Sequence, residues 1–289
     1  MSACARGRRR SLKEDQALRQ LGLEFLGVFG LSPVELVHIA ADLDCQFIGT
    51  VPAPIDYNPE NYPKWNLMED AGLRRDLKAA LKDRGVELLL GDGNAFLPGT
   101  DARETIAPQL DLYKELGIRK VNSISFEPDL QRTYDQFGIF VEMAVERGLE
   151  PSIEACPISV VGDLATAIGA VRHAGAPAKI LLDVMHFFRS GTPLQDLADA
   201  SDMIGHIQLC DAPRQPVIAD YLEEAMFERR LPGDGDAPVA EILATLANVP
   251  TIGLEIPLRS LAEQGLGPRG RMERCVASAR KVIAEADAA

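Results

Sequence analysis

The chain has 289 residues, of which 46% are hydrophobic, and its formal net charge is −13 at pH 7. This length suits one α/β barrel, and the composition is ordinary for a globular protein. The acidic charge repels phosphate backbones and anionic lipid surfaces, so we expect no binding to nucleic acid or to membranes. No apolar run approaches the roughly 20 residues that cross a bilayer.

The first 20 residues form a basic extension, because Arg6, Arg8, Arg9, Arg10 and Lys13 stand there with no acid before Glu14. No apolar stretch follows, as it would in a secretory signal. We expect a flexible extension over residues 1–20 and one folded domain over residues 21–289; an organelle-targeting peptide is the alternative interpretation of the extension. The five cysteines lack Cys-x-x-Cys spacing, which is typical of reduced thiols in a cytoplasmic protein.

Apolar strands alternate with helical stretches along the whole domain. The predicted strands cover residues 21–28, 46–51, 86–91, 119–125, 149–155, 178–184, 204–210 and 251–256. Helices are expected from residue 32, over 68–84, 102–116, 129–147 and 159–174, from residue 193, and over 238–247 and 269–286. Eight such units predict a single-domain (β/α)8 TIM barrel. An open doubly wound sheet is the alternative, but no Gly-x-Gly-x-x-Gly turn follows the first strand.

Local signals support these boundaries. Ser32-Pro33-Val34-Glu35 has the pattern of a capping box, and Thr192 before Pro193 predicts the start of the sixth helix. Glycines after a cation or Leu mark helix ends before several of the strands.

Three connections are long, and all of them follow the C-terminal ends of predicted strands. They cover residues 52–66, 91–101 and 211–237. Long loops at this end of a barrel place the functional site there. The first loop contains Tyr57 and Trp65, the only tryptophan of the chain. These aromatic residues form either a wall of the substrate site or a self-packed surface loop.

Polar residues interrupt four neighbouring strands near their C-terminal ends: Glu154, Asp183, Gln208 and Glu255. In a barrel these side chains converge, and three carboxylates in an apolar setting are costly to ionise unless a cation binds them. The pattern therefore predicts a site for a divalent metal. A ligand set made only of oxygen favours Mn²⁺ or Mg²⁺ over Zn²⁺. His206 lies on the same face as Gln208, one layer deeper, where core packing is the expected role.

The same residues carry a resemblance to a known family. Glu154, Asp183-Val-Met-His186, His206-Ile-Gln208-Leu-Cys-Asp211-Ala-Pro, Leu-Glu255 and Pro232-Gly-Asp-Gly-Asp236 resemble segments of the xylose isomerase-like TIM-barrel family of sugar phosphate isomerases and epimerases. The likeness extends from about residue 21 to the end. It implies that Glu154, Asp183, Gln208 and Glu255 bind the metal and that His186 contacts substrate. Arg214 matches a substrate-contacting arginine of tagatose-type epimerases. Many members have His in place of Gln208, and dimers and tetramers occur in the family.

The resemblance implies an isomerase or epimerase that acts on a small sugar or related polyhydroxy ketone. Glu154 and Glu255 would exchange protons with the substrate through an enediolate. The runner-up is a dehydratase of the same fold, of the 3-dehydroshikimate or keto-inositol type. A zinc apurinic endonuclease is disfavoured because the second and third strands end without histidine, and a non-catalytic binding subunit is a further alternative.

Overall fold

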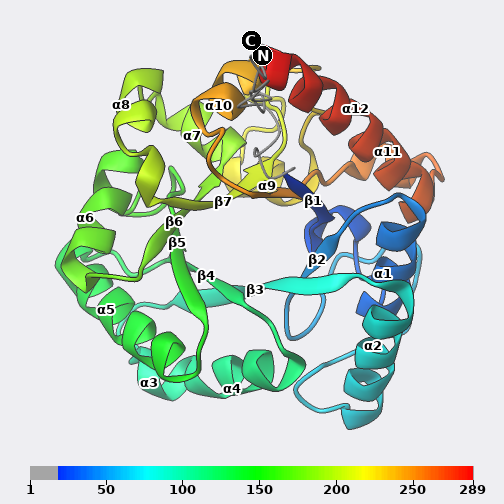
Figure 1. Ribbon diagram of the computed structural model, residues 1–289, viewed down its shortest axis with the longest axis horizontal. Helices are drawn as coiled ribbons and strands as arrows, with labels where there is room; N and C mark the ends of the chain where they lie inside the picture. The colour runs from blue at the N-terminus through cyan, green and yellow to red at the C-terminus, as the bar shows by residue number, and fades with distance from the viewer. Residues whose placement is uncertain (1–18, 289) are drawn as a thin grey trace, which may run out of the picture.

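The computed structural model describes residues 19–288, which form a closed barrel of eight parallel strands ringed by helices (Figure 1). Each strand pairs with the next along the chain, and the last pairs with the first. The predicted (β/α)8 barrel is therefore confirmed. The strands are β1 (Gln20–Leu23), β2 (Phe47–Thr50), β3 (Glu87–Phe96), β4 (Lys120–Ser125), β5 (Glu150–Glu154), β6 (Lys179–Asp183), β7 (Ile204–Leu209) and β8 (Thr251–Leu254).

Twelve α-helices lie outside or at the ends of the barrel within the described residues. They are α1 (Pro33–Asp42), α2 (Ala71–Arg84), α3 (Ala102–Thr105), α4 (Ala107–Leu116), α5 (Leu130–Glu146), α6 (Leu164–Ala174), α7 (Val184–Ser190), α8 (Leu194–Asp199), α9 (Tyr221–Phe227), α10 (Val239–Thr245), α11 (Arg259–Glu263) and α12 (Pro268–Ala288). Ser32 caps α1 as predicted, because its hydroxyl accepts a hydrogen bond from the backbone N–H of Glu35 at 3.3 Å.

Several predicted boundaries are wrong at the ends of the strands. The first strand stops at Leu23, and residues Phe25–Val28 form a 3₁₀ helix that leads to Phe29 in the left-handed region. Strand β3 continues to Phe96, past the expected end at residue 91, through a shift in register opposite β4. The segment from Gly91 to Asn94 was expected as a loop, but both of these residues pair with β4, and Asp92 and Gly93 lie at the register shift between them.

The helix predicted from residue 193 is present, but a further helix that was not predicted, α7, precedes it. Helix α7 begins directly after β6, and the Asp183 carboxylate caps it by accepting from the backbone N–H of His186 at 2.9 Å. The next helix, α8, then begins one residue later than predicted, with Pro193 as its N-cap. The short helices α9 and α11 were not predicted at all, because each lies in a connection rich in polar and turn-forming residues.

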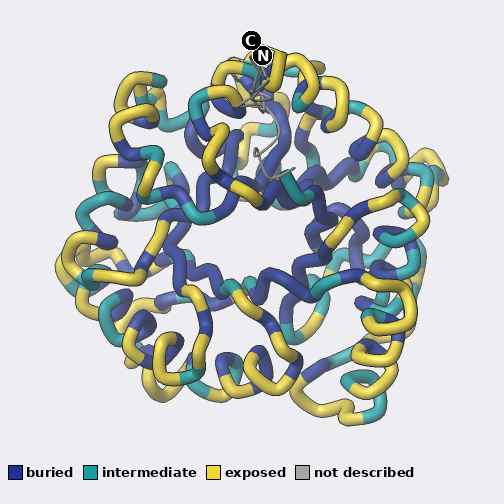
Figure 2. The backbone as a smooth tube through the Cα atoms, viewed as in Figure 1, coloured by how far each residue is buried: buried dark blue, intermediate teal, exposed yellow. Residues whose placement is uncertain are grey.

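The strands and the inward faces of the helices are buried, whereas the outward faces of the helices are exposed (Figure 2). Four cysteines of the described chain, Cys45, Cys156, Cys210 and Cys275, are buried and free. Within residues 19–288, no helix combines the length and apolar character needed to span a membrane. The basic extension that was predicted over residues 1–20 lies almost entirely outside the described residues.

The barrel interior contains a buried polar layer below its C-terminal end. The Glu24 carboxylate lies 3.1 Å from Nε2 of His206, and Nδ1 of that ring lies 2.9 Å from Oγ1 of Thr251. Glycines make this arrangement possible, because a Cβ atom at Gly49 or Gly253 would lie 1.9 Å from a Glu24 oxygen. His206 therefore has the structural role in the core that its position predicted.

The close packing of Gly22 against Phe47 can be tested by substitution. A Cβ atom there would lie 2.2 Å from the fully buried ring of Phe47. Gly22→Ala is therefore expected to lower the free energy of unfolding by about 1–3 kcal/mol, as overpacking does in other cores. Urea denaturation followed by circular dichroism measures this change.

The matched control is Gly138→Ala in the interior of α5, where an added Cβ meets nothing within 4 Å. This variant is expected to be about 0.5–1 kcal/mol more stable, because alanine loses less backbone entropy than glycine in a helix. Equal unfolding midpoints for the two variants would contradict close packing of Gly22 against Phe47.

Candidate active site

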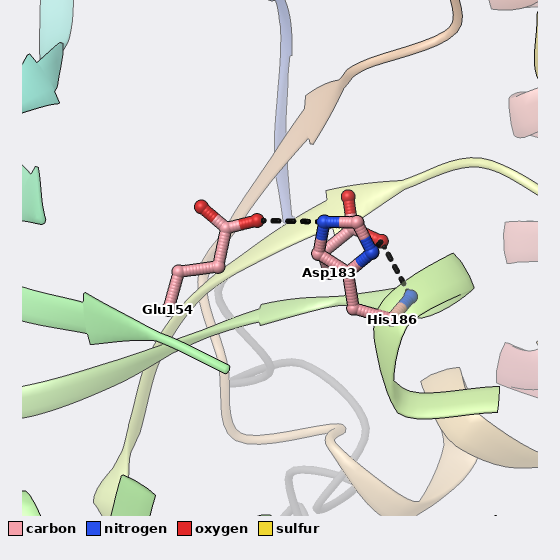
Figure 3. A group of neighbouring side chains, drawn as sticks. All are labelled: Glu154, Asp183 and His186. Carbon is pink, nitrogen blue, oxygen red and sulfur yellow. Dashed lines mark hydrogen bonds and ion pairs between the residues drawn. The ribbon is translucent and has the colours of Figure 1, made fainter. Parts of the chain in front are cut away.

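The predicted carboxylates of β5 and β6 meet a histidine at the C-terminal end of the barrel (Figure 3). Glu154 is the last residue of β5, and Asp183 is the last residue of β6. Because α7 begins at once, its first turn places His186 between them, with Nε2 3.3 Å from Glu154 Oε1. One ligand atom from each of these three residues lies within 4.8 Å of the others.

Gln208 and Glu255 join the same end of the barrel from β7 and from the residue after Leu254. Gln208 stands opposite Asp183 in the pairing of β6 with β7. Its Nε2 donates to Glu255 Oε1 at 3.2 Å. All four residues that the sequence predicts as metal ligands thus lie at one end of the barrel, and all four are buried.

Arg229, which the sequence analysis did not single out, connects two of these carboxylates. It follows α9 and is only 3% exposed. Its Nη1 donates to Asp183 Oδ2, and its Nη2 lies 3.0 Å from Glu255 Oε2. The guanidinium therefore provides a positive charge between two of the predicted ligands.

Asp92 and Asn122 complete the arrangement on the opposite side. Asn122 Nδ2 donates to Glu154 Oε2 at 2.8 Å and to Asp92 Oδ1 at 3.4 Å. Gln208 Nε2 donates to the other oxygen of Asp92 at 3.4 Å. Asp92 lies in the segment of β3 that the sequence had predicted as a loop.

These contacts close into a ring in which carboxylates alternate with donors. We call it the carboxylate–donor ring. Its members in order are Glu154, His186, Asp183, Arg229, Glu255, Gln208, Asp92 and Asn122.

The pKa values in the ring reflect four acids sharing few positive charges. Burial, and next the charge of Glu154, raise the pKa of Asp92 to about 7. Burial also raises the pKa of Glu255 well above its usual range, although Arg229 opposes this. For Asp183, burial acts upward but is outweighed by Arg229 and His186, so its pKa is lowered. Burial acts downward on His186, yet Asp183 and its other neighbours raise its pKa well above the ordinary value.

The donor set fits a divalent cation. The buried Oε1 of Gln208 has no hydrogen-bond partner among the described residues, so a ligand oxygen is left over. Four carboxylates face one guanidinium and one imidazole, and a dication would relieve the remaining repulsion. Glu154, Asp183 and His186 would hold it, because each offers a ligand atom and these atoms lie within 4.8 Å of one another.

A cavity of about 440 Å³ opens above the ring. Five ring members line its base: Asp92, Glu154, His186, Arg229 and Glu255. Its upper wall is mostly apolar and includes Phe25, Val51, Ile55, Ile124, Phe126, Leu222 and Met226. Helix α9 contributes to this wall, and its Tyr221 hydroxyl lies 2.7 Å from Nδ1 of His186. The cavity is of a size that holds a small molecule against charged groups.

Three residues expected to contact substrate lie outside the lining of this cavity. Tyr57 packs edge-on against Phe29, and its hydroxyl lies 3.2 Å from a Glu263 oxygen. The indole Nε1 of Trp65 donates to the Gly30 carbonyl at 3.1 Å. The two aromatic side chains therefore pack within the protein, whereas residues 52–55 of the same loop line the cavity.

Arg214, the third of these residues, is exposed, and its guanidinium carbon lies 5.5 Å from the centre of the Phe188 ring. The arginine that reaches the cavity is Arg229. Arg229 stands directly before Arg230-Leu-Pro-Gly, a segment that a bridge between Arg230 and Asp211 joins to the end of β7, and the sequence alone does not reveal this contact.

The Asp211 carboxylate holds the segment Arg230-Leu-Pro-Gly in place. It accepts hydrogen bonds from the backbone N–H groups of Ala212, Gly233, Gly235 and Ala237. A Cβ atom at Gly235 would lie 2.2 Å from the carboxylate, so glycine is required there. The loop that follows Arg229 is thereby fixed to the end of β7.

The fold and site define a TIM-barrel protein with a carboxylate-rich centre at the C-terminal ends of its strands. The sequence matches the family described as xylose isomerase-like TIM barrel over residues 37–275, and the chain belongs to that family. No curated protein matches the chain.

Several solved structures resemble the chain in fold. A zinc-bound IolI protein has a TM-score of 0.76 at 16% identity, with 92% of this chain and 98% of that chain covered. The probable 3-DHS dehydratase AsbF from Bacillus anthracis has a TM-score of 0.67 at 15% identity and covers 90% and 98%. A D-psicose 3-epimerase has a TM-score of 0.67 at 14% identity and covers 91% and 99%. At these identities the likeness establishes the fold alone.

The contribution of the buried ion pairs of Arg229 to stability can be tested by substitution. Arg229→Met leaves Asp183 and Glu255 without their cation, and removing one partner of a buried pair costs about 3–5 kcal/mol of unfolding free energy. Urea denaturation in EDTA at pH 8 measures the loss. Because Arg229 helps to lower the pKa of Asp183, this stabilisation is present at neutral pH and is lost as the pH falls through the folded-state pKa. The two proteins should therefore converge in acid.

The control is Arg103→Met, which breaks an exposed pair with Glu142. Exposed pairs contribute less than about 1 kcal/mol, so this variant should unfold nearly as the parent does. An Arg229→Met protein as stable as the control at pH 8 would contradict the role of the guanidinium.

Proposed function

We propose that the protein is a divalent-metal-dependent isomerase or epimerase that acts on a small polyhydroxylated ketone or aldehyde. One observation carries the proposal: Glu154 and Glu255, two carboxylates from strands on different sides of the ring, line the base of one cavity. Two such groups can act as base and acid at a substrate bound between them. The family of the chain, and the epimerase and IolI structures that share its fold, support this activity.

The contacts of the two carboxyl groups suit this chemistry. Glu154 is held from both sides, by His186 at one oxygen and by Asn122 at the other, and accepts from both. It is therefore the proposed base. Glu255, which lies across the ring from Glu154 and lines the same cavity, is the proposed acid. Proton removal by one group and return by the other moves or inverts a C–H bond beside the carbonyl.

Two further ring members would bind and orient the substrate. His186 faces the cavity, and the Tyr221 hydroxyl at Nδ1 fixes the orientation of its ring. Arg229 also faces the cavity and can donate to a substrate oxygen while it remains paired with Asp183. A divalent cation at this site, with Gln208 and Glu255 as proposed further ligands beside Glu154 and Asp183, would, when bound, polarise the carbonyl and acidify the neighbouring C–H bond.

Mn²⁺ or Mg²⁺ is the proposed ion, because the donor set predicted from the sequence contains only oxygen. The free buried cysteines agree with a cytoplasmic enzyme, the location proposed here. The substrate is proposed to be a small carbohydrate-like molecule, and nucleic acid is not a proposed partner.

A dehydratase of the same fold is the second candidate, and the apolar upper wall of the cavity favours it. An open-chain sugar carries hydroxyl groups along its whole length and would leave several of them against Phe25, Ile55 and Phe126 without partners. A ring with a deoxygenated edge fits this wall better. The same carboxylates would then remove a proton while a β-hydroxyl leaves, and the dehydratase named among the similar folds supports this alternative.

Deuterium exchange tests the proposal. The Mn²⁺-loaded protein is incubated in D₂O with a panel of ketoses and with 3-dehydroshikimate, and the products are followed by NMR and ultraviolet absorbance. Deuterium beside the carbonyl without loss of water is the result expected for an isomerase or epimerase. A new conjugated absorbance would instead identify the dehydratase. If no ketone shows deuterium exchange or a new absorbance, both the isomerase or epimerase and the dehydratase proposals are overturned.

The carboxylates are tested with isosteric variants. Glu154→Gln and Glu255→Gln are each expected to reduce kcat by about 10²- to 10⁴-fold, the usual contribution of a general acid or base. Glu142→Gln, on the exposed face of α5, is the matched control and should keep full activity. Full activity in Glu154→Gln would show that this residue is not the base.

A further inference from the structure

Asp92 is the one carboxylate of the ring to which neither the metal nor the acid–base step assigns a role. Its backbone and side chain are nevertheless held from several directions. The Asp92 carbonyl accepts from Gln109 Nε2 at 3.0 Å and from the Tyr113 hydroxyl, both on α4. The shift in register between Gly91 and Asn94, with Gly93 at φ +80°, turns this segment of β3. The structure thus fixes a carboxylate beside Gln208.

The amide of Gln208 has two possible orientations, and only one of them presents oxygen to a cation. An amide has two hydrogens on nitrogen and two acceptor sites on oxygen, whereas an ionised carboxylate only accepts. Gln208 Nε2 lies 3.4 Å from Asp92 Oδ2 and 3.2 Å from Glu255 Oε1, so both of its hydrogens face carboxylates. Its Oε1 is buried and has no hydrogen-bond partner among the described residues.

We propose that Asp92 is a positioning residue that fixes the Gln208 amide so that its oxygen, and not its nitrogen, is left free for the divalent cation. This inference rests on the metal site of the proposed function. Glu255 shares the amide hydrogens, but it is itself a predicted ligand and is paired with Arg229. Among residues 19–288, the Asp92 side chain accepts from Gln208, from Asn122 and from the backbone N–H of Gly93, and it is paired with no arginine.

Asp92 also contacts a second amide, that of Asn122. Asn122 Nδ2 also faces this carboxylate, and its Oδ1 lies 3.3 Å from the Ser152 hydroxyl, which can donate to it. The same acceptor therefore orients a second amide, which donates to Glu154. Asp92 thus lies between the two amides that contact Glu154 and Glu255, one on each side.

A double-mutant cycle separates orientation from charge. The affinity for Mn²⁺ is measured by electron paramagnetic resonance at pH 8 for four proteins: the parent, Asp92→Asn, Gln208→Glu and the double variant. In the parent background, Asp92→Asn is expected to weaken Mn²⁺ binding by about 10- to 100-fold, as loss of a group that orients a metal ligand does. In the Gln208→Glu background either orientation presents an oxygen, so the same substitution should change the affinity by less than about threefold.

An equal loss in both backgrounds would overturn the inference, because it would mean that Asp92 acts through its charge or as a direct ligand. Unchanged affinity of Asp92→Asn in the parent background would overturn it as well. If the parent itself binds no Mn²⁺, the proposed function fails at its first step, and that result differs from either of these.

Two controls keep the experiment interpretable. Asp76→Asn makes the same change of charge on the exposed outer side of α2 and should leave Mn²⁺ affinity unchanged. Asp92→Ala, compared with Asp92→Asn by far-ultraviolet circular dichroism and thermal melting without metal, identifies any loss of folding. A folded Asp92→Ala protein is expected to lose Mn²⁺ affinity as Asp92→Asn does, and unchanged binding by it would contradict the proposal.

Discussion

The alternation of carboxylates with donors around the mouth of the barrel is the constraint on which the site depends. A buried carboxylate costs several kcal/mol unless a donor or a cation compensates it, and a buried donor without an acceptor is costly too. The ring meets both requirements, since every acid has a donor on each side and every donor lies between two acids. Such a closed network is strengthened by low dielectric and weakened by the loss of any one member.

The barrel is shaped to admit these polar groups. Glycines at positions 49 and 253 leave space for Glu24, which pairs with His206 below the ring. On β3, the irregular pairing around Gly93 turns the chain where Asp92 enters the ring. On the side of β7, Asp211 binds four backbone N–H groups and holds the segment that follows Arg229. Irregular backbone segments therefore place polar side chains where regular strands do not.

The sequence predicts some residues of the site and not others, because some lie in regular strands and others in irregular segments. Glu154, Asp183, Gln208 and Glu255 interrupt apolar strands, so the sequence alone predicted that they converge, and the fold followed from the same strand pattern. Asp92 lies between glycines, which are typical of a loop, and only pairing with β4 reveals the strand. Arg229 follows the connection over residues 210–228, whose path no periodicity specifies. Arg214 is nearer to β7 in sequence but ends up at the surface.

Glutamine at position 208 is chemically suited to this ring in a way that histidine is not. The side chain stands between Asp92 and Glu255, and both are acceptors. Neutral imidazole has one N–H and one lone pair, so it can satisfy one of these carboxylates and then bind a cation, but the second stays without a donor. An amide donates two hydrogens and keeps an oxygen for a ligand. Glutamine at this position is thus suited to a fourth carboxylate, Asp92. Because Asp92, within β3, and Glu255 both accept, the proposed metal site requires at this position of β7 a side chain with two donors and one free acceptor.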